Sequence, residues 1–156
     1  MIRIELDTPA RDDVAQLLDE HLTDMFATSP ADSVHALDRS ALAGPDITFW
    51  TAREGSTLLG CAALKRFSPR SGEIKSMRTA AESRGRGVAS RLLTHLIAQA
   101  RRDLLDDLYL ETGTQEYFAP ARRLYQRHGF TECLPFAGYR LDPNSIFMRL
   151  ILRELP

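Results

Sequence analysis

Residues 84–90 read Arg84-Gly85-Arg86-Gly87-Val88-Ala89-Ser90, and they lie where an expected strand gives way to an expected helix. The preceding residues 72–79 carry side chains that favour an extended chain. The residues that follow, 88–100, place apolar side chains at helical spacing. The first turn of a helix has unpaired backbone N–H groups and the positive end of the helix dipole. This segment is therefore suited to binding an anion.

The glycines and arginines of the segment support that interpretation. Gly85 and Gly87 leave the backbone uncovered, because neither has a Cβ that would block a ligand. Arg84, Arg86 and Arg91 add positive charge to a chain whose net charge is only −1. The anion that this arrangement implies is a phosphate ester.

The segment has three other possible interpretations: a P-loop, a dinucleotide-binding fingerprint and a turn without a ligand. A P-loop needs Lys followed by Ser or Thr after its second glycine, whereas Val88 and Ala89 follow Gly87. A dinucleotide-binding fingerprint would have a third glycine where Ser90 stands, and only about 70 residues would remain for the rest of a doubly wound sheet. In the third interpretation the glycines form a tight turn and the arginines are solvated. Spacing disfavours the first two and leaves the third open.

A second motif lies downstream, at Ala121-Arg122-Arg123-Leu124-Tyr125-Gln126-Arg127-His128-Gly129-Phe130. It resembles the A-x-x-L-Y-x-x-x-G-F helix-to-strand signature of the GNAT acetyltransferase superfamily. The first motif is similar to the R-x-x-G-x-A pyrophosphate loop of the same superfamily, with Arg84, Gly87 and Ala89 at the defining positions. One expected strand, over 107–112, separates the two motifs, as it does in that superfamily.

The resemblance covers residues 45–150 well and the first 40 residues only in general plan. It implies an α+β fold, with a mixed, mainly antiparallel sheet, a splayed central strand pair and flanking helices. The length of 156 residues and the hydrophobic content of 44% suit a single domain over residues 1–156. The further elements expected are a strand over 1–6, a helix N-capped by Thr8 with Pro9 in its first turn, a short helix over 34–41, hairpin strands over 47–53 and 57–67, and a last strand over 145–152.

The resemblance also implies where coenzyme A lies. Its pantetheine arm would occupy the slot between the strand of Met77 and Thr79 and the strand over 107–112, paired with the backbone of the former. The amides of residues 84–90 would hold the pyrophosphate. The expected cofactor-binding residues are Met77, Arg78, Thr79, Arg84, Gly85, Arg86, Gly87, Val88, Ala89, Ser90 and Phe118. Phe118 stands where the family often has Asn, so an amide contact is lost or replaced by packing on the arm.

Acetyl transfer to an amine requires two proton movements. An alkylamine with a pKa of about 10.4 is almost fully protonated at pH 7, so a group must accept its proton. Glu73 is the preferred catalytic base, with Glu111 and Glu116 as alternatives, and each could instead be an exposed carboxylate at the end of a strand. Tyr125 occupies the position that resembles the general acid of the family, which protonates the departing thiolate. A packed helix tyrosine is its other interpretation.

The predicted function is acetyl-CoA-dependent N-acetylation of a primary amine of a small molecule or peptide, by direct transfer in a ternary complex. The alternative is a non-catalytic acyl-CoA-binding or regulatory module. The acceptor is expected between residues 25–42 and 138–144, where basic side chains would suit a carboxylate-bearing acceptor and acidic ones a polyamine or peptide. The basic side chains are Lys75, Arg78 and Arg140, and the acidic side chains are Glu20, Asp24, Asp32 and Asp38.

Composition limits the partners. The near-zero net charge disfavours nucleic acid, and the absence of a long apolar run disfavours a membrane. No signal peptide is visible, so a cytoplasmic protein is expected, and a homodimer is compatible with the sequence. Cys61 and Cys133 are too few for a metal site or a disulfide framework, and both are expected in the core. His21 is expected to be a hydrogen-bonded histidine at the core edge, and no metal is expected.

Overall fold

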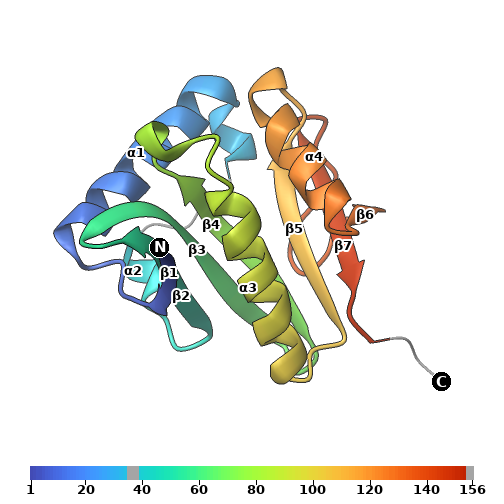
Figure 1. Cartoon of the computed structure of the whole chain (residues 1–156). Coiled ribbons are helices and arrows are strands. Elements are labelled where there is room, and N and C mark those ends of the chain that lie inside the picture. The colour runs from blue at the N-terminus through green and yellow to red at the C-terminus, as the bar shows by residue number, and fades with distance from the viewer. Residues whose placement is uncertain (35–38, 154–156) are drawn as a thin grey trace.

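The computed structural model of the chain describes residues 1–34 and 39–153. Within these ranges seven strands form one sheet in the order β1-β2-β3-β4-β5-β7-β6 (Figure 1). Its strands are β1 (Ile2–Leu6), β2 (Ile47–Glu54), β3 (Thr57–Ser68), β4 (Ser71–Thr79), β5 (Asp107–Gly113), β6 (Thr131–Cys133) and β7 (Ser145–Ile151). All neighbouring strands are antiparallel except β4 and β5, which are parallel.

Helices cover both faces of this sheet (Figure 1). The helical elements are α1 (Asp12–Thr28), η1 (Ala31–Ser33), α2 (Arg39–Leu42), η2 (Ala81–Ser83), α3 (Val88–Arg102), η3 (Glu116–Phe118) and α4 (Ala119–Arg127). Side chains of α1 and α2 pack in one apolar cluster with Cys61 and Ala63 of β3, and side chains of α3 and α4 pack in another with Ala62 and Leu64. Alternate residues of a strand face opposite sides, so the two clusters lie on opposite faces. The predicted α+β fold is confirmed.

The helix that follows the first motif forms as the periodicity predicts. Six apolar side chains of α3, at the expected helical spacing, are buried in the larger cluster: Val88, Leu92, Leu93, Leu96, Ile97 and Ala100. Burial of each larger side chain stabilises the fold by roughly 1.5–3 kcal/mol. The start of α3 is therefore held firmly against the end of β4.

The central strands β4 and β5 separate along their length (Figure 1). They pair only at Ser71 with Asp107, Gly72 with Leu108, and Glu73 with Tyr109. Beyond this point β4 continues to Thr79 and β5 to Gly113 without pairing to each other. Backbone groups that face the gap are thus left for another partner, as the splayed strand pair of the predicted fold requires.

A β-bulge interrupts β4 beside this gap. On β3, Cys61 lies opposite Arg78 and Ala63 opposite Lys75, so the single residue Ala62 faces both Ser76 and Met77. Ser76 has a φ of 52°, in the left-handed region that non-glycine residues seldom adopt. Bulges of this kind redirect side chains locally.

Some expected details differ from the structure. The first helix begins at Asp12 rather than at Pro9, because Thr8 closes a turn: its Oγ1 accepts a hydrogen bond from the Ala10 amide, and its carbonyl accepts one from the Arg11 amide. Of the helix expected over 34–41, the structure shows α2 from Arg39 onward; residues 35–38 lie outside the described residues, and η1 precedes the expected range. Cys61 is buried as expected, but Cys133 is only half-buried because it lies on the edge strand β6.

A buried arginine ties β1 and α1 to the sheet. Arg53 is 2% exposed and donates to Asp13 Oδ2 at 2.7 Å and to Asp7 Oδ2 at 3.2 Å. Burial by itself raises the pKa of Asp7, but hydrogen bonds from Thr51, the Thr8 amide and Arg53 outweigh it and hold that pKa below its usual value. The hydrogen bond from Arg53 is the main cause of the lowered pKa of Asp13.

These lowered pKa values predict acid lability. A carboxylate with a depressed folded-state pKa contributes stability above its unfolded pKa of about 3.9, and loses it as the pH falls through the folded value. The free energy of unfolding, measured with urea between pH 3 and 7, should therefore fall below about pH 4. Asp7→Asn should lower it by about 2 kcal/mol at pH 7 and make the acid decline shallower. Asp32→Asn, at an exposed carboxylate, is the control, and an equally steep decline in Asp7→Asn would contradict this account.

Candidate active site

The loop between β4 and α3 has an open backbone. Gly85 and Gly87 have φ values of 81° and 76°, and a Cβ built on either would meet nothing within 4 Å. Gly87 is the N-cap of α3 in the left-handed conformation, and no side chain caps this helix start. The first N–H groups of α3 are therefore available to an anion, as the sequence predicts.

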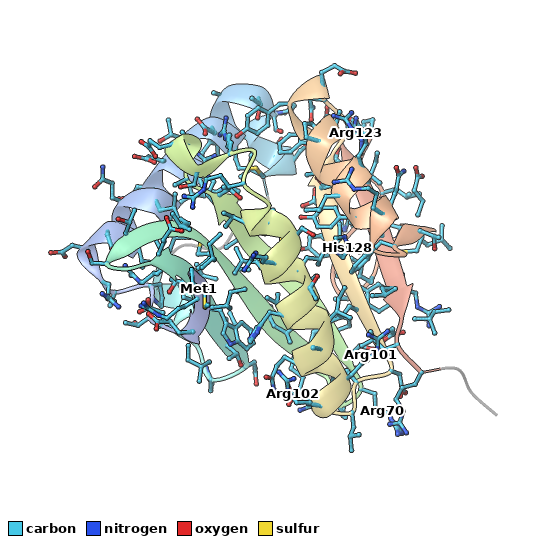
Figure 2. All side chains as sticks on the ribbon, viewed as in Figure 1. Met1, Arg70, Arg101, Arg102, Arg123 and His128 are labelled. Carbon is cyan, nitrogen blue, oxygen red and sulfur yellow. The ribbon has the colours of Figure 1, made fainter. Side chains whose placement is uncertain are left out.

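The side chains of this loop do not all face one ligand. Arg86 Nη2 donates to both carboxylate oxygens of Glu54 at 2.9 Å, so this arginine is directed towards the β2–β3 hairpin. Val88 is 1% exposed, which leaves its backbone N–H as its contribution to a site. Ser90 Oγ lies 3.3 Å from Nε2 of His128. His128 is the residue that follows α4 (Figure 2). Anion binding here would rest mainly on the backbone and on Arg84, which is exposed.

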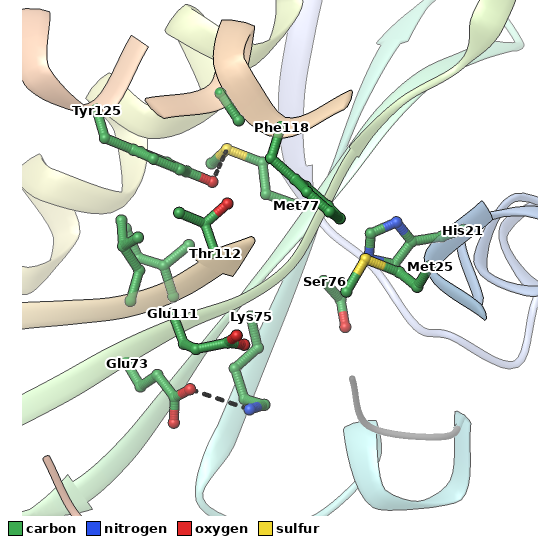
Figure 3. A pocket seen from close by; sticks show the side chains of 13 residues that line it. His21, Met25, Glu73, Lys75, Ser76, Met77, Glu111, Thr112, Phe118 and Tyr125 are labelled. Atoms are coloured by element: carbon green, nitrogen blue, oxygen red, sulfur yellow. Dashed lines mark hydrogen bonds and ion pairs between the residues drawn. The ribbon is translucent and has the colours of Figure 1, made fainter. Parts of the chain in front are cut away.

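A pocket of about 110 Å³ lies where β4 and β5 diverge (Figure 3). Residues of β4, β5, α1, η3 and α4 line it. They include Met77 and Phe118 from the predicted cofactor set, and both predicted catalytic residues, Glu73 and Tyr125. The structure thus brings together side chains from positions far apart in the chain. Thr79 follows on β4, paired to Gly60 of β3.

Tyr125 reaches the pocket from α4. Its side chain is 8% exposed, and its hydroxyl contacts Met77 Sδ at 3.9 Å (Figure 3). Burial, with a smaller contribution from the negative charge of Glu111, raises the pKa of Tyr125 to about 12. The phenol is therefore protonated at neutral pH and has a proton to donate.

Glu73 is joined to two other polar side chains by hydrogen bonds. Lys75 Nζ donates to Glu73 Oε2 at 3.0 Å and to Tyr139 Oη at 2.9 Å, and Tyr139 Oη donates to the same Oε2 at 2.5 Å. Glu73 and Lys75 are 4% and 9% exposed. Burial and the charge of Glu73 raise the pKa of Tyr139 far above its usual value. Protonation of Oε2 would disturb two of these hydrogen bonds.

The other two candidate carboxylates are placed very differently. Glu111, on β5, is half-buried and lines the pocket between Tyr125 and Lys75 (Figure 3). Its charge contributes to the raised pKa of both Tyr125 and Tyr139, so it lies within electrostatic reach of both phenols. Glu116 is exposed and does not line the pocket.

Arg78 joins the two sides of the gap. Its Nη1 contacts Asp24 Oδ2 of α1 at 2.7 Å and Tyr117 Oη of η3 at 3.1 Å. Tyr117 Oη also donates to Asp24 Oδ2 at 3.3 Å. The chain neighbours of these three residues, Met77, Met25 and Phe118, line the pocket. Arg78 is not among the residues that line this pocket, and its side chain is held by Asp24 and Tyr117.

Phe118 fills the position where the family often has Asn. It is 8% exposed and lines the pocket. A Cβ on Gly113 would come within 2.3 Å of its ring, so this packing requires a glycine at the end of β5. Pro120 lies in the first turn of α4, as expected.

Two pocket residues come from α1: His21, which sequence reasoning did not assign to the site, and Met25, the first residue of the segment 25–42 expected at the acceptor. His21 and Met25 line the pocket one helical turn apart. Burial, with a contribution from Arg78, lowers the pKa of His21 to about 4, so its imidazole is neutral at pH 7. The apolar spacing of α1 indicates a core face, and nothing in that pattern shows that β4 and β5 separate beneath it.

Among residues 1–34 and 39–153, no group of three His, Cys, Asp or Glu side chains could hold a metal ion, and no helix is long and apolar enough to cross a membrane.

Comparison with known proteins assigns this arrangement to a family. The acetyltransferase (GNAT) family model matches residues 12–130. The chain is 48% identical over 147 residues to the uncharacterized N-acetyltransferase YsnE of Bacillus subtilis, covering 94% of this chain and 97% of the relative. It is also similar to the crystal structure of a Klebsiella pneumoniae protein described as an acyl-CoA N-acyltransferase, at 26% identity, with a TM-score of 0.79 and coverage of 98% and 99%.

A third comparison concerns the fold alone. The crystal structure of a Bacillus subtilis acetyltransferase in complex with CoA has a TM-score of 0.73 to this chain at 19% identity, covering 98% of this chain and 100% of that one. Its similarity extends over the sheet and the helices on both faces. The family match spans most of the chain, and a relative is about half identical over nearly its full length. The protein therefore belongs to the GNAT family of acetyltransferases and is an acyltransferase enzyme.

Proposed function

We propose that the protein transfers the acetyl group of acetyl-CoA directly to a primary amine of a small molecule or peptide, within a ternary complex. The observation that carries this proposal is the continuity of two features. The uncapped start of α3 lies at the end of β4, and β4 and β5 separate into the pocket that contains Tyr125. Acetyl-CoA has a pyrophosphate and a thioester joined by one pantetheine arm, so binding it would need both the anion site at α3 and the pocket between β4 and β5. The CoA complex of the structural relative supports the same cofactor.

The backbone would recognise most of the coenzyme. The amides of residues 84–90 would bind the pyrophosphate, and the gap-facing groups of Met77 and Thr79 would pair with the pantetheine amides. The pairing of β4 with β5 stops at Glu73, so the groups beyond it have no strand partner on that side. Phe118 and Met77 supply apolar walls for the arm.

For the catalytic base, the geometry favours Glu111 over Glu73. Glu73 Oε2 accepts hydrogen bonds from Lys75 and Tyr139, so a proton arriving at this oxygen would compete with two donors. Glu111 lines the same pocket, is half-buried, and lies within electrostatic reach of Tyr125. We assign proton removal from the acceptor to Glu111, directly or through a water. Glu73 would hold Lys75 and Tyr139 in place.

The chemical step then balances as follows. The amine nitrogen forms a bond to the acetyl carbonyl carbon while its proton passes to Glu111. The tetrahedral intermediate collapses by breaking the carbon–sulfur bond, and Tyr125 donates its proton to the departing thiolate. The products are an N-acetylated amine and the free thiol of CoA, and the proton held by Glu111 returns to the phenolate of Tyr125 through water. A cytoplasmic location and a homodimer remain predictions from the sequence.

Glu111→Gln is expected to slow acetyl transfer by about tenfold or more at pH 7, while the affinity for acetyl-CoA stays unchanged. The loss should shrink as the pH rises, because a larger fraction of an alkylamine with a pKa near 10.4 is then already neutral. Rate against pH is the measurement. Glu116→Gln, at an exposed carboxylate outside the pocket, is the control. A pH-independent defect would argue against a role in proton removal.

A panel of primary amines with acetyl-CoA, followed by release of free thiol, tests the proposed function itself. Turnover with any amine, and acetylated product seen by mass spectrometry, would support the enzyme. Tight binding of acetyl-CoA without turnover across small-molecule and peptide amines would favour the binding module instead. Absence of binding would refute both.

A further inference from the structure

The pocket between β4 and β5 reaches both faces of the sheet. His21 and Met25 of α1 line it, and so do Ala121 and Tyr125 of α4. Side chains of α1 and of α4 pack in separate apolar clusters, on opposite faces of the sheet. A single pocket with walls from both helices therefore runs through the gap that β4 and β5 leave between them.

The pairing of the strands shows which polar walls belong to the face of α1. Lys75 lies opposite Ala63 of β3, which packs with α1, and Glu73 precedes Lys75 by two residues on the same face. Glu73 pairs with Tyr109 of β5, so Glu111, two residues further along β5, shares that face as well. The two carboxylates and the lysine that line the pocket thus lie at its α1 end.

The cofactor of the proposed function would occupy the other end. Residues 84–90 lead into α3, whose apolar side chains share a cluster with Tyr125, and Met77 packs against that cluster. A pantetheine arm that starts at the pyrophosphate would therefore enter the gap from the face of α3 and α4. The acceptor amine would then reach the thioester from the opposite end, between the two strands and α1.

His21 is the polar side chain that α1 contributes to this end of the pocket (Figure 3). The hydrogen bond predicted for this histidine is not found, because among residues 1–34 and 39–153 no group forms one with its ring. Neither ring nitrogen is among the fully buried polar atoms of the same ranges that lack a partner. The structure thus leaves both nitrogens to a ligand in the pocket.

The charges around His21 suit an ammonium group. Burial keeps the imidazole neutral at pH 7, with a pKa of about 4, and the nearby charges of Arg78 and Asp24 are paired with each other at 2.7 Å. At the α1 end two carboxylates accompany one lysine, and Lys75 Nζ is 3.0 Å from Glu73 Oε2. The described walls are therefore net negative, and a neutral imidazole adds a hydrogen-bond acceptor without adding positive charge.

We propose that a ring nitrogen of His21 accepts a hydrogen bond from the reacting amine of the acceptor, an inference that rests on the proposed function. A primary ammonium group has three N–H donors, so it can donate to His21 and to Glu111 at once. Glu111 then takes the proton, while His21 gains none and holds the amine at the α1 end of the pocket. His21 therefore contributes mainly to acceptor affinity and little to the chemical step.

The first test replaces the ring and uses an amine that wild type accepts, under conditions in which KM reports affinity. His21→Phe keeps an aromatic ring and removes both nitrogens. It should raise KM for the amine about tenfold, as loss of one hydrogen bond to a charged group does, and change kcat by less than about threefold. His21→Gln keeps a neutral hydrogen-bonding group and should restore most of the affinity.

The cofactor and a second histidine provide the controls. KM for acetyl-CoA, and its dissociation constant from calorimetry, should be the same in wild type and both His21 variants, because the cofactor occupies the other end of the pocket. His95→Phe is the matched variant. His95 lies on α3, outside this pocket, with its ring 5.5 Å from that of Trp50 between centroids, and burial lowers its pKa as well. Its replacement should leave both KM values unchanged.

The outcomes separate the two proposals. Wild type that fails to bind acetyl-CoA, or that acetylates no amine, overturns the proposed function and this inference with it. Wild type that turns over, while His21→Phe keeps the same KM for the amine, overturns the role of His21 alone. A His21→Phe variant with a lowered melting temperature and equally raised KM values for amine and acetyl-CoA, without recovery in His21→Gln, would show a structural role and also overturn it.

Discussion

Gly87→Asp is expected to weaken binding of CoA by roughly a hundredfold or more. At this N-cap position the open side of the backbone is where the pyrophosphate should lie, and a Cβ there meets no protein atom. A carboxylate would place a negative charge within about 4 Å of a phosphate oxygen, which costs several kcal/mol at the effective dielectric of a protein surface. It would also bond to the N–H groups of the first helical turn and compete for them.

Two variants isolate this effect in calorimetric titrations. Gly87→Asn has nearly the same shape without the charge, so it should lose much less affinity than Gly87→Asp. Gly55→Asp, in the β2–β3 turn, also places Asp at a positive φ in open space, at 61°, but outside residues 84–90 and next to Glu54, the partner of Arg86. It should lower stability by a similar amount and leave CoA binding unchanged. A folded Gly87→Asp variant with wild-type affinity would remove the phosphate site from this loop.

Tyr125→Phe is expected to slow acetyl transfer by roughly 10²-fold, the low end of what a positioned proton donor contributes. The raised pKa of about 12 keeps the phenol protonated at neutral pH, so wild type always has this proton available. The variant keeps the ring, including its edge contact with Phe130 at 5.9 Å between centroids. Cofactor binding and melting temperature should therefore change little, which places the defect in the chemical step.

The measurement requires conditions in which chemistry limits the rate, such as single-turnover kinetics. Tyr109→Phe is the matched control: its hydroxyl donates to Asp107 Oδ2 at 3.1 Å, in a structural cluster outside the pocket. That variant should lose some stability and keep its transfer rate. Equal single-turnover rates for wild type and Tyr125→Phe would leave Tyr125 as a packing residue.

The local elements of the site could be predicted from sequence because their causes are local. The two glycines, the apolar spacing of α3 and the order of the two motifs predict a strand, an open turn and a helix start, and each is observed. The same reasoning places Tyr125 on a helix facing the core, where it is found. The start of α1 was predicted wrongly because Thr8 can cap a helix or close a turn, and the neighbouring contacts of Asp7 with Arg53 lie far away in sequence.

The choice among the carboxylates could not be made from sequence. Glu73 and Glu111 both lie on strands that border the gap, so their patterns are alike. The structure adds contacts that these patterns do not show: Tyr139, from the loop before β7, donates to Glu73 across 66 positions of the chain. In the same way, Asp24 and Tyr117 reach Arg78 from two other elements and divert its side chain from the predicted cofactor contact.

The sequence by itself determined the open glycine loop before α3, the order of the elements and the family resemblance, because backbone freedom and hydrophobic periodicity act between near neighbours in the chain. Only the tertiary structure decided which charges are paired, that Glu111 lies within electrostatic reach of Tyr125, and that Ser76 has a buried hydroxyl without a described partner. The physical reason is that ion pairing and burial depend on groups brought together across the divergence of β4 and β5. Strand pairing and a bulge create that divergence, and no single segment encodes it.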